Sequence, residues 1–421
     1  MRQIIYRRVL ACLAVILVFS QVFQLALKYH KESLAAVEEV PVEEELTLWY
    51  TDEKLNEYLV KAAAQFEQER DVEVTLQLVT AVDYIELIGR ASVSESGGPD
   101  LHIASSELLE KARLAGLAAE NDSYMPRELE ARFPQKALDA ASCGGKLVAY
   151  PFYFETCFLL YNRNYVEQAP DNVDAILAFS DTFEAAGDME KVENIFKWNV
   201  SDIFYDFFFI ANYVNLGGPT GDDPYQVALA AEKVVQCLQY YQSLNEFFAI
   251  DAETVTTDDV LQEFMDGKTI YTIAKTDAIA RLDEASDQEE HPFYGIALVP
   301  DLTEELQTKG LSVTNSVVVN PYSDNRNKAK EFARYITYDK VDDLYALSQK
   351  MPVKKGVVYE NEQMQILIDQ YEDSVEVPKI TELSNYWLWM ELTFANIWKG
   401  NDVQTEIHAI SERIHQQLAA E

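Results

Sequence analysis

Residues 145–162 read GKLVAYPFYFETCFLLYN and form the most informative segment of the chain. The pattern predicts an apolar strand, a bend marked by Pro151 and a second apolar strand. Glu155 and Thr156 place a carboxylate and a hydroxyl in the middle of the apolar run. This arrangement is typical of a strand that crosses between two structural units, with polar groups at the crossing point. An ordinary hairpin in a core sheet fits the segment equally well, so the rest of the chain has to distinguish the two interpretations.

Length and composition indicate a folded protein with more than one domain. The chain has 421 residues, of which 48% are hydrophobic, enough for two cores of ordinary size. Its formal net charge is −37, from 71 acidic and 34 basic residues. Because phosphate and anionic lipid are recognised by basic surfaces, this charge argues against a nucleic-acid partner and against docking on an anionic membrane surface. It does not identify a ligand.

The first 27 residues predict a membrane segment. Arg2, Arg7 and Arg8 precede an uncharged, mostly apolar run from Val9 to Leu27. A run of about 19 residues is long enough to span a bilayer, and the preceding arginines orient the remaining chain outward. We favour an uncleaved anchor over a cleaved signal peptide, because no A-x-A cleavage pattern follows the run. A lipoprotein signal at Cys12 is disfavoured, since most of the apolar run follows that cysteine.

The acidic stretch 28–45 that comes next predicts an extended tether, since like charges repel one another. Beyond it, Cys143, Cys157 and Cys237 are an odd number of cysteines without a C-x-x-C pair. This pattern disfavours a metal cluster, and it leaves a Cys143–Cys157 disulfide open. The fold of an exported chain of this length does not depend on so few cysteines.

The body alternates predicted strands and helices, which indicates an α/β fold with a parallel sheet. In its first part we expect strands at 46–50, 72–79 and 101–104, and helices at 52–70, 84–92 and from 105 to Ala115, before Gly116. In its second part we expect strands at 268–273, 293–300 and 312–321, and helices at 172–186, 201–216, 225–248, 257–266, 327–337, 341–348, 361–371 and from 385 to the end.

Polar loops follow two of the predicted strands, where an open α/β sheet binds its ligands. Trp49 leads into Thr51-Asp52-Glu53, and the next strand of this kind leads into Ser105-Ser106-Glu107. Each loop precedes a helix whose first N–H groups are free. Capping of those helices by Asp52 and Ser106 explains the same residues, and the two roles are compatible.

The body resembles the extracellular solute-binding proteins of ABC importers, in the branch similar to maltose-binding protein. The likeness rests on blocks whose order and spacing cover nearly all of residues 46–415. They are Leu48-Trp49-Tyr50, Gly98-Pro99-Asp100-Leu101 with Ala115-Gly116-Leu117-Ala118, Gly145 to Asn162, Asp266-Gly267-Lys268 with Tyr271-Thr272-Ile273, and more weakly Met351-Pro352-Val353 with Pro378 and Tyr386-Trp387-Leu388-Trp389.

The resemblance implies the two-lobed periplasmic-binding-protein fold of type II. On it, residues 46–154 with a return segment 299–320 form the N-lobe, and residues 158–296 with 322–421 form the C-lobe. Tyr153–Cys157 and Tyr294–Leu298 would be hinge strands, and a ligand would be enclosed between the lobes by a hinge motion.

The resemblance also implies ligand-binding residues. Glu155 and Glu107 match positions of polar ligand contacts, Trp387 matches an aromatic platform that stacks on sugar, and Phe204 and Tyr205 lie near a further aromatic contact. Aromatic faces and carboxylates suit sugars, because C–H faces stack on rings and hydroxyls donate to acceptor oxygens. Core packing is the alternative for Trp387 and is favoured for Trp389.

The chain departs from its sugar-binding relatives after Tyr271-Thr272-Ile273. Where those proteins place small residues and an aromatic, this chain has Ala274-Lys275-Thr276-Asp277. Lys275 and Asp277 indicate a more polar ligand, or a pocket closed by a contact between the two side chains. The expected ligand-binding set is thus Trp49, Asp52, Ser105, Ser106, Glu107, Glu155, Tyr205, Lys275, Asp277 and Trp387.

These observations predict the substrate-binding component of an ABC importer, a monomer on the outer face of the membrane that captures a carbohydrate for permease subunits. No hydrolase, metalloprotease or phosphate-loop motif is present, so we expect no enzyme activity, no cofactor and no metal. A glycosidase pair of Glu107 and Glu155 is the disfavoured enzymatic reading. Two non-enzymatic alternatives stay open: an anchored sensor that uses the same fold, and a site for a polyamine-like cation.

Overall fold

The computed structural model describes residues 44–94, 97–122, 126–184, 190–229, 231–286, 293–383 and 385–419. The predicted membrane segment 9–27 and most of the tether lie outside these residues. None of the helices in the described ranges has the length and apolar character needed to cross a membrane. Glu45–Glu421 form one compact unit.

The first part of the body follows the predicted strand and helix order closely. Asp52 caps the first short helix by accepting a hydrogen bond from the Lys54 amide at 3.0 Å. The predicted parallel pairing is confirmed by the alignment of Leu48 with Leu101 and of Trp49 with His102. The elements are β1 (Glu44–Tyr50), η1 (Glu53–Leu55), α2 (Asn56–Arg70), β2 (Val72–Leu78), α3 (Tyr84–Ser92), β3 (Leu101–Ser105) and α4 (Ser106–Leu114).

Short elements then lead into the long strand β6. They are α5 (Pro126–Arg132), α6 (Gln135–Ala140), β4 (Ser142–Cys143), β5 (Lys146–Leu147) and β6 (Tyr150–Asn162). The segment that follows β6 contains α7 (Val173–Thr182), β7 (Asn194–Phe196), α8 (Ile203–Asp206), α9 (Phe208–Ala211), β8 (Asn215–Leu216), β9 (Val227–Ala228), α10 (Glu232–Phe248), α11 (Thr257–Met265), β10 (Thr269–Lys275), η3 (Thr276–Ala278), α12 (Ile279–Ala285) and β11 (Tyr294–Ala297).

The last part of the chain begins with β12 and ends in two helices. Its elements are β12 (Leu311–Val319), α13 (Arg326–Arg334), the π-helical η4 (Tyr335–Asp339), η5 (Val341–Asp343), α14 (Leu344–Ser348), β13 (Met351–Pro352), α15 (Met364–Asp373), β14 (Val375–Glu376), η6 (Thr381–Leu383), α16 (Tyr386–Trp398) and α17 (Val403–Ala419). The single helix predicted from 385 onward is broken at Gly400, whose φ of +101° is left-handed, and Asp402 then accepts from the Thr405 amide.

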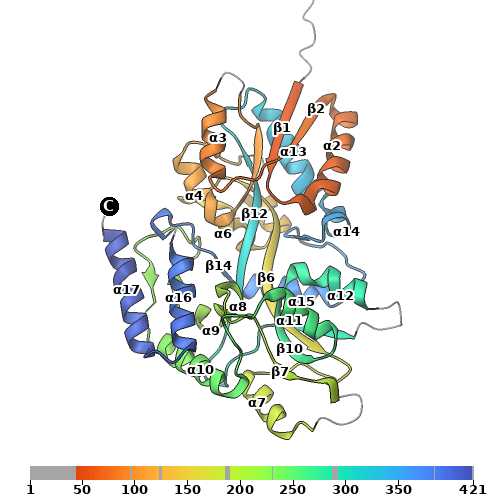
Figure 1. The fold of residues 1–421 in the computed structure, drawn as a ribbon. Helices are drawn as coiled ribbons and strands as arrows, with labels where there is room; N and C mark the ends of the chain where they lie inside the picture. The colour runs from red at the N-terminus through yellow and green to blue at the C-terminus, as the bar shows by residue number, and fades with distance from the viewer. Residues whose placement is uncertain are drawn as a thin grey trace, which may run out of the picture. The chain divides into compact units, whose positions relative to one another are not determined.

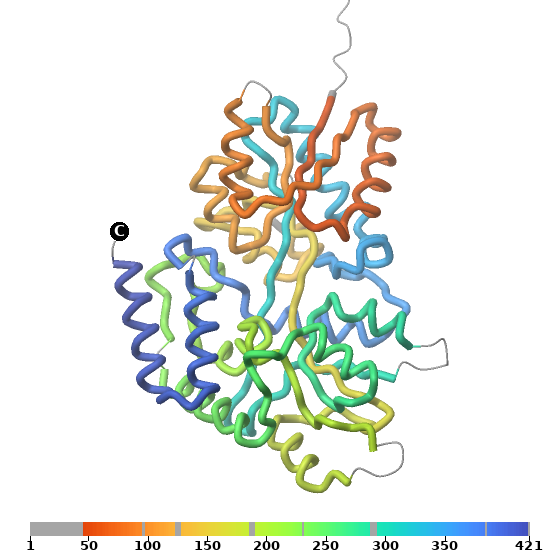
Figure 2. Tube along the Cα trace, in the orientation of Figure 1, coloured from red at the N-terminus to blue at the C-terminus, as the bar shows by residue number. Residues whose placement is uncertain are grey.

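Two strands, β6 and β12, connect separate hydrophobic cores. The sheet order is β2-β1-β3-β12-β6-β10-β7, and both strands run between the N-terminal elements and the elements of the second half (Figures 1 and 2). Phe152 of β6 and Val317 of β12 belong to the first core, around β1 and α2. Leu159 and Leu311 belong to a second core, around α10, α16 and α17. Phe158 belongs to a third, around α12 and α15.

The second expected hinge strand, Tyr294–Leu298, contributes no residue to the first core and so does not cross between the lobes. It forms β11, which pairs with the end of β6 from Leu159 to Asn162, and Tyr294 and Ile296 both lie in the third core. The connecting role belongs to β12, whose partner changes from β14 at Leu311 to β3 at Val319.

The expected lobe boundaries also differ from the packing at two places. Residues 299–306, assigned to the return into the N-lobe, contribute Val299, Leu302 and Leu306 to the second core. Residues 326–348, assigned to the C-lobe, contribute Phe332 and Leu344 to the first core instead. Short-range pattern does not reveal such placements, because the same apolar face can pack on either core.

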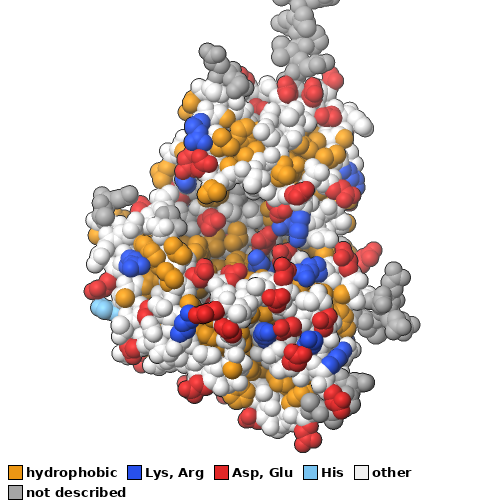
Figure 3. Space-filling view, viewed as in Figure 1, with side chains coloured by type: hydrophobic (Ala, Val, Ile, Leu, Met, Phe, Trp, Pro, Cys, Tyr) orange, Lys and Arg blue, Asp and Glu red, His pale blue; other side chains and the backbone are white. Residues whose placement is uncertain are grey.

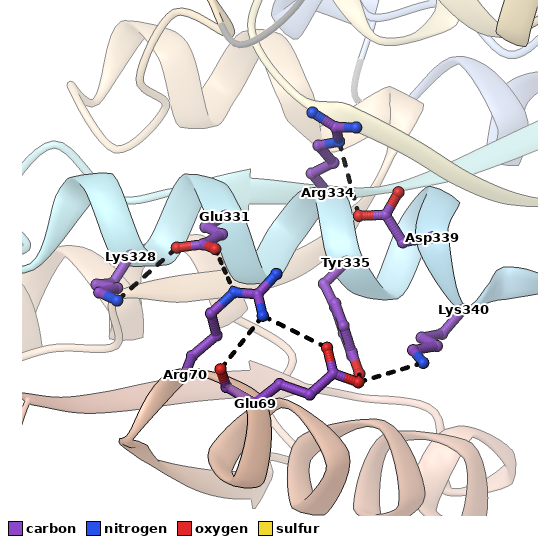
Figure 4. A network of polar contacts seen from close by, with 8 residues as sticks. All are labelled: Glu69, Arg70, Lys328, Glu331, Arg334, Tyr335, Asp339 and Lys340. Atoms are coloured by element: carbon purple, nitrogen blue, oxygen red, sulfur yellow. Dashed lines mark hydrogen bonds and ion pairs between the residues drawn. The ribbon is translucent and has the colours of Figure 1, made fainter.

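Polar contacts on the surface match the position of α13 beside α2 (Figure 4). Arg70 Nε lies 2.5 Å from Glu331 Oε1, and the Tyr335 hydroxyl donates to Glu69 at 3.0 Å. Lys340 Nζ lies 3.4 Å from the same Glu69 carboxylate. These ion pairs are exposed and contribute little energy individually, so the buried contacts of the first core fix the arrangement.

Candidate functional site

The long strand β6 changes partner at the polar pair that the sequence singles out. Residues up to Thr156 pair with β12, and residues from Cys157 onward pair with β10, where Cys157 lies opposite Lys275. Because alternate residues of a strand share a face, Glu155 lies on the same face as Cys157 and Lys275. Two of the expected site residues are therefore neighbours on one face at the crossing point.

A buried lysine binds two of the expected carboxylates together. Lys350 lies between α14 and β13, and its Nζ is 2.6 Å from Asp52 Oδ2 and 2.7 Å from Glu155 Oε1. Only 6% of the Lys350 side chain is exposed, against 27% for each carboxylate. The same Nζ lies 5.4 Å from the ring centre of Tyr153. Three segments distant in sequence thus meet at one ammonium group.

The two carboxylates determine the charge state of Lys350. Desolvation is the largest single effect and lowers the pKa of its ammonium, but the charges and hydrogen bonds of Glu155 and Asp52 together outweigh it and leave the pKa raised. Lys350 is therefore charged at neutral pH. Burial, with smaller contributions from Asp52 and Glu155, raises the pKa of the Tyr153 hydroxyl well above its usual value, so Tyr153 stays neutral.

A cavity of about 370 Å³ contains the expected residues Tyr205, Lys275 and Asp277. Its wall consists of β10, η3, α11 and α12, and Lys54 of η1 contributes from the N-terminal part of the body. Polar groups in the lining include Asn199, Thr257, Asp258, Thr272 and Arg281. In the space-filling view, the face drawn is hollowed near its centre, where apolar side chains are bordered by acidic and basic ones (Figure 3).

Lys275 and Asp277 line this cavity without forming the contact that the sequence left open. Among the described residues, Asp277 makes no ion pair with Lys275, whose Nζ instead lies 5.2 Å from the ring centre of Phe204 and 5.7 Å from that of Tyr205. Ammonium groups over aromatic faces are attracted by the ring quadrupole. Burial raises the pKa of the Tyr205 hydroxyl, so that it remains a neutral donor.

Trp387 lies half-buried on α16, outside the lining of this cavity. Its ring packs edge-on against Phe207 at 5.3 Å and Tyr386 at 4.9 Å. Trp389, for which packing was favoured, lies under the guanidinium of Arg413 at 5.3 Å. Helix α16 contacts α8, which carries Phe204 and Tyr205. Trp387 is thus partly committed to the second core, with the rest of its surface open to solvent.

Ser105, Ser106 and Glu107 separate into different environments. Ser106 is buried, and its hydroxyl donates to Glu376 of β14 at 2.7 Å. Glu376 also accepts from the Thr314 amide at 2.7 Å, so it joins α4 to β12. Ser106 therefore has a structural partner, and its hydroxyl is not free for a ligand.

The side chain of Glu107 is exposed, but neighbouring protein atoms shield its carboxyl group partly from water. Desolvation raises the pKa of its carboxyl, and a hydrogen bond from Ser105 at 3.4 Å opposes that shift. Glu107 lies outside the lining of the cavity beside β10, so its role as a ligand contact stays a prediction.

Trp49 lies near the end of β1 and Asp52 follows that strand, but the two side chains have different partners. The indole of Trp49 is half-buried against a small cluster with Tyr84 and Ile88, and its carbonyl accepts from the Tyr84 hydroxyl at 3.0 Å. Asp52 serves as a helix cap and as a partner of Lys350. Capping, expected as an alternative for Asp52, is present together with its position in the lysine cluster.

The three cysteines in the described part of the chain form no disulfide, and burial raises the pKa of each thiol. Cys143, Cys157 and Cys237 are all free and buried, so the Cys143–Cys157 bond left open by the sequence is not formed. Burial raises the pKa of the Cys143 thiol to about 12. Cys143 does lie close to Glu110 and Asp222, but Glu110 is paired with Arg113 and the thiol is neutral, which is unsuited to metal binding.

Two important residues of the site were not predicted. Lys350 directly precedes Met351-Pro352-Val353, which was recognised only as a weak block of the resemblance, and Glu376 lies two residues before Pro378. A lysine or glutamate beside such a block does not predict a buried, partnered side chain, because charged residues are usually exposed. Their partners are distant in the sequence and are brought close only by the fold.

The comparisons with known proteins agree with this arrangement. The profile of the bacterial extracellular solute-binding protein family matches residues 61–367. The maltodextrin-binding protein MdxE of Bacillus subtilis (strain 168) is 23% identical over 358 residues, which cover 81% of this chain and 82% of that protein.

Solved structures show the same fold. The extracellular solute-binding protein from Staphylococcus aureus in complex with maltose superposes with a TM-score of 0.77 at 21% identity, covering 90% of this chain and 98% of that one. The maltose-binding protein MalE from Listeria monocytogenes gives 0.76 at 20% identity, covering 90% and 99%. The two-lobed, mixed α/β architecture of these proteins is the fold of this chain, and the chain belongs to the bacterial extracellular solute-binding protein family.

Proposed function

We propose that this protein is the carbohydrate-capturing component of an ABC importer and binds its ligand in the cavity beside β10 by closure of two lobes. The observation that carries the proposal is this cavity, which adjoins the crossing point of β6 and combines the aromatic residue Tyr205 with several polar side chains. An apolar ring face with convergent polar groups suits a sugar. The relatives named above are maltose- or maltodextrin-binding proteins, which supports the same ligand class.

The polyamine alternative is weakened by Lys350. A cationic ligand needs free carboxylates, but Asp52 and Glu155 already share one buried ammonium group. Displacing it would leave a buried lysine without a partner, which is costly. The sensor alternative gains no specific support from any observation on the molecule.

We propose further that residues 9–27 hold the protein at the membrane, that 28–45 space it outward, and that permease subunits receive the ligand. This part of the proposal rests on the sequence pattern and on membership of an extracellular family. Fractionation of cells before and after deletion of residues 9–27 tests it, and release of the full-length protein by mild washing would contradict anchoring.

The extent of the ligand site beyond the cavity lining is tested by two tryptophans on α16, which contacts α8 and thereby Tyr205 of the lining. If the bound sugar reaches the exposed part of the Trp387 ring, Trp387→Ala should weaken binding about two- to tenfold, since stacking of a ring on sugar contributes about 0.5–1.5 kcal/mol. Trp389→Ala is the matched control, because it removes the same group from the opposite face of α16 and should leave affinity unchanged. Calorimetric titration with a glycan panel measures both, and equal affinities of the two variants would contradict the assignment of Trp387.

Glu155→Ala tests the crossing point. The variant should weaken ligand binding if Glu155 contacts the ligand, as the resemblance implies. The free energy of unfolding should also fall by about 1–2 kcal/mol, because Lys350 keeps only Asp52 as a partner. Urea denaturation measures this, and an unaltered midpoint would show that Asp52 alone satisfies the ammonium group.

A further inference from the structure

Two lysines without a carboxylate partner line the same cavity. Lys54 belongs to η1 and Lys275 to the end of β10. Within the described ranges of the chain, neither side chain takes part in an ion pair, whereas most of the lysines there do. Such pairs are common on a protein of net charge −37, because carboxylates outnumber basic groups two to one. Lys54 and Lys275 thus give the lining of this cavity two ammonium groups without an ion-pair partner in the described structure.

The other charges of the cavity neutralise these lysines only in part. Arg281 and Asp258 are occupied with one another, at 2.7 Å between Nη1 and Oδ1. Asp277 is the remaining acidic side chain of the lining, and it forms no ion pair with Lys275 among the described residues. The cavity thus holds a positive excess inside a strongly acidic protein. At physiological ionic strength, charges further than about 8 Å are largely screened, so a ligand in the cavity experiences mainly these nearby groups.

The position of Lys275 combines a charge with an aromatic surface. Its Nζ lies over Phe204 and Tyr205, and its strand position is fixed by pairing with Cys157 of the crossing strand. A saccharide ring beside these aromatics would bring a substituent within reach of the ammonium group. Lys54 of η1 contributes a second ammonium group to the same lining from the N-terminal part of the body, so two separate elements offer cations to one anionic ligand.

We propose that the ligand is an acidic saccharide, whose carboxylate or phosphate group is bound by Lys275 and Lys54. This inference rests on the proposed function and narrows it to a ligand class. The shared chemistry is an anionic oxygen group on a sugar ring, and Asp277 accepts hydrogen bonds from its neutral hydroxyls. Lys275 selects the charged ligand over its neutral counterpart, and Lys54 links that selection to closure.

Calorimetric titration of the full-length protein with matched ligands tests the proposal. The probes are maltotriose and cellotriose, the same two trisaccharides oxidised at C6 to uronates, and their 6-phosphates. We expect at least one acidic form to bind about tenfold or more tightly than its neutral parent, as is typical of a charge-assisted contact. The uronate and phosphate arms identify which anionic group is preferred.

Three variants connect the preference to the lysine. Lys275→Met keeps an apolar stem over the two rings and should reduce the ratio of acidic to neutral affinity about tenfold, whereas Lys275→Arg should retain most of it. Lys399→Met, which removes an equal charge from an exposed pair with Glu253 outside the cavity, should leave the ratio unchanged.

The outcomes separate the two proposals. If neutral saccharides bind as tightly as their acidic forms, or if Lys275→Met leaves the ratio unchanged, the acidic-ligand inference is overturned while carbohydrate capture stands. If no saccharide of either kind binds, carbohydrate capture itself fails and the inference fails with it.

Discussion

Lys350 and Lys275 lie at the same strand crossing, and they differ in burial and in their carboxylate partners. Lys350 is buried, and its ammonium group contacts two carboxylates within 2.7 Å. Lys275 is half-buried beside a cavity and faces two aromatic rings, with no carboxylate partner in the described structure. The difference indicates that Lys350 stabilises the folded protein through its carboxylate partners. Lys275 has no such partner, so its charge remains available to a ligand.

The largest effect on stability should follow from removing the ion pairs of Lys350. Lys350→Met leaves Asp52 and Glu155 facing one another without a cation, so the free energy of unfolding should fall by about 3 kcal/mol. Chemical denaturation at pH 7 measures this loss. A variant as stable as the wild type at pH 7 would show that the ion pairs are energetically neutral.

His102 sharpens the comparison, because it is an ionisable group with neither a partner nor a cavity. It lies fully buried on β3, and both ring nitrogens lack hydrogen-bond partners. Desolvation lowers its pKa from 6.5 to about 3. Below pH 6.5 the histidine therefore binds a proton in the unfolded chain but not in the folded protein. The free energy of unfolding thus decreases as the pH falls from 6.5 toward 3.

His102→Leu should remove that part of the pH dependence. Between pH 6.5 and 4.5 the wild type should lose about 2–3 kcal/mol more than the variant, at roughly 1.4 kcal/mol for each pH unit. Because the many carboxylates titrate equally in both proteins, the difference between the two denaturation series isolates the histidine. Parallel curves for the two proteins over this range would contradict a depressed pKa.

The sequence was sufficient to predict local structure and the position of the crossing, but not which core each later segment joins. Periodicity predicted α3 to the residue, and the polar pair Glu155-Thr156 marks the point where β6 changes partner. Periodicity could not assign 326–348 to the first core, because an amphipathic face carries no information about its distant partner. The same limit concealed Lys350 and Glu376. Their partners lie far away in the sequence and come close only in the folded chain.

Among the expected site residues, strand-end position was a better guide than residue type alone. Asp52, Glu155, Lys275 and Asp277 all lie near the ends or crossing points of strands, and the structure brings them to the crossing or to the adjoining cavity. Ser106 and Trp49 fit the same pattern but are engaged by Glu376 and by a small apolar cluster. Tertiary partners that the sequence does not reveal thus decide which polar residues remain open to a ligand.

The smallest effect should come from the unpaired lysine. Lys275→Met removes a cation that makes no ion pair, and the lost attraction to the Phe204 and Tyr205 rings is on the order of 0.5–1 kcal/mol at most. Met retains an unbranched apolar stem over the same rings, which offsets part of that loss. The urea midpoint should therefore stay close to that of the wild type, in contrast to Lys350→Met. A destabilisation as large as that of Lys350→Met would mean that Lys275 has an unrecognised structural role and would remove the distinction between the two lysines.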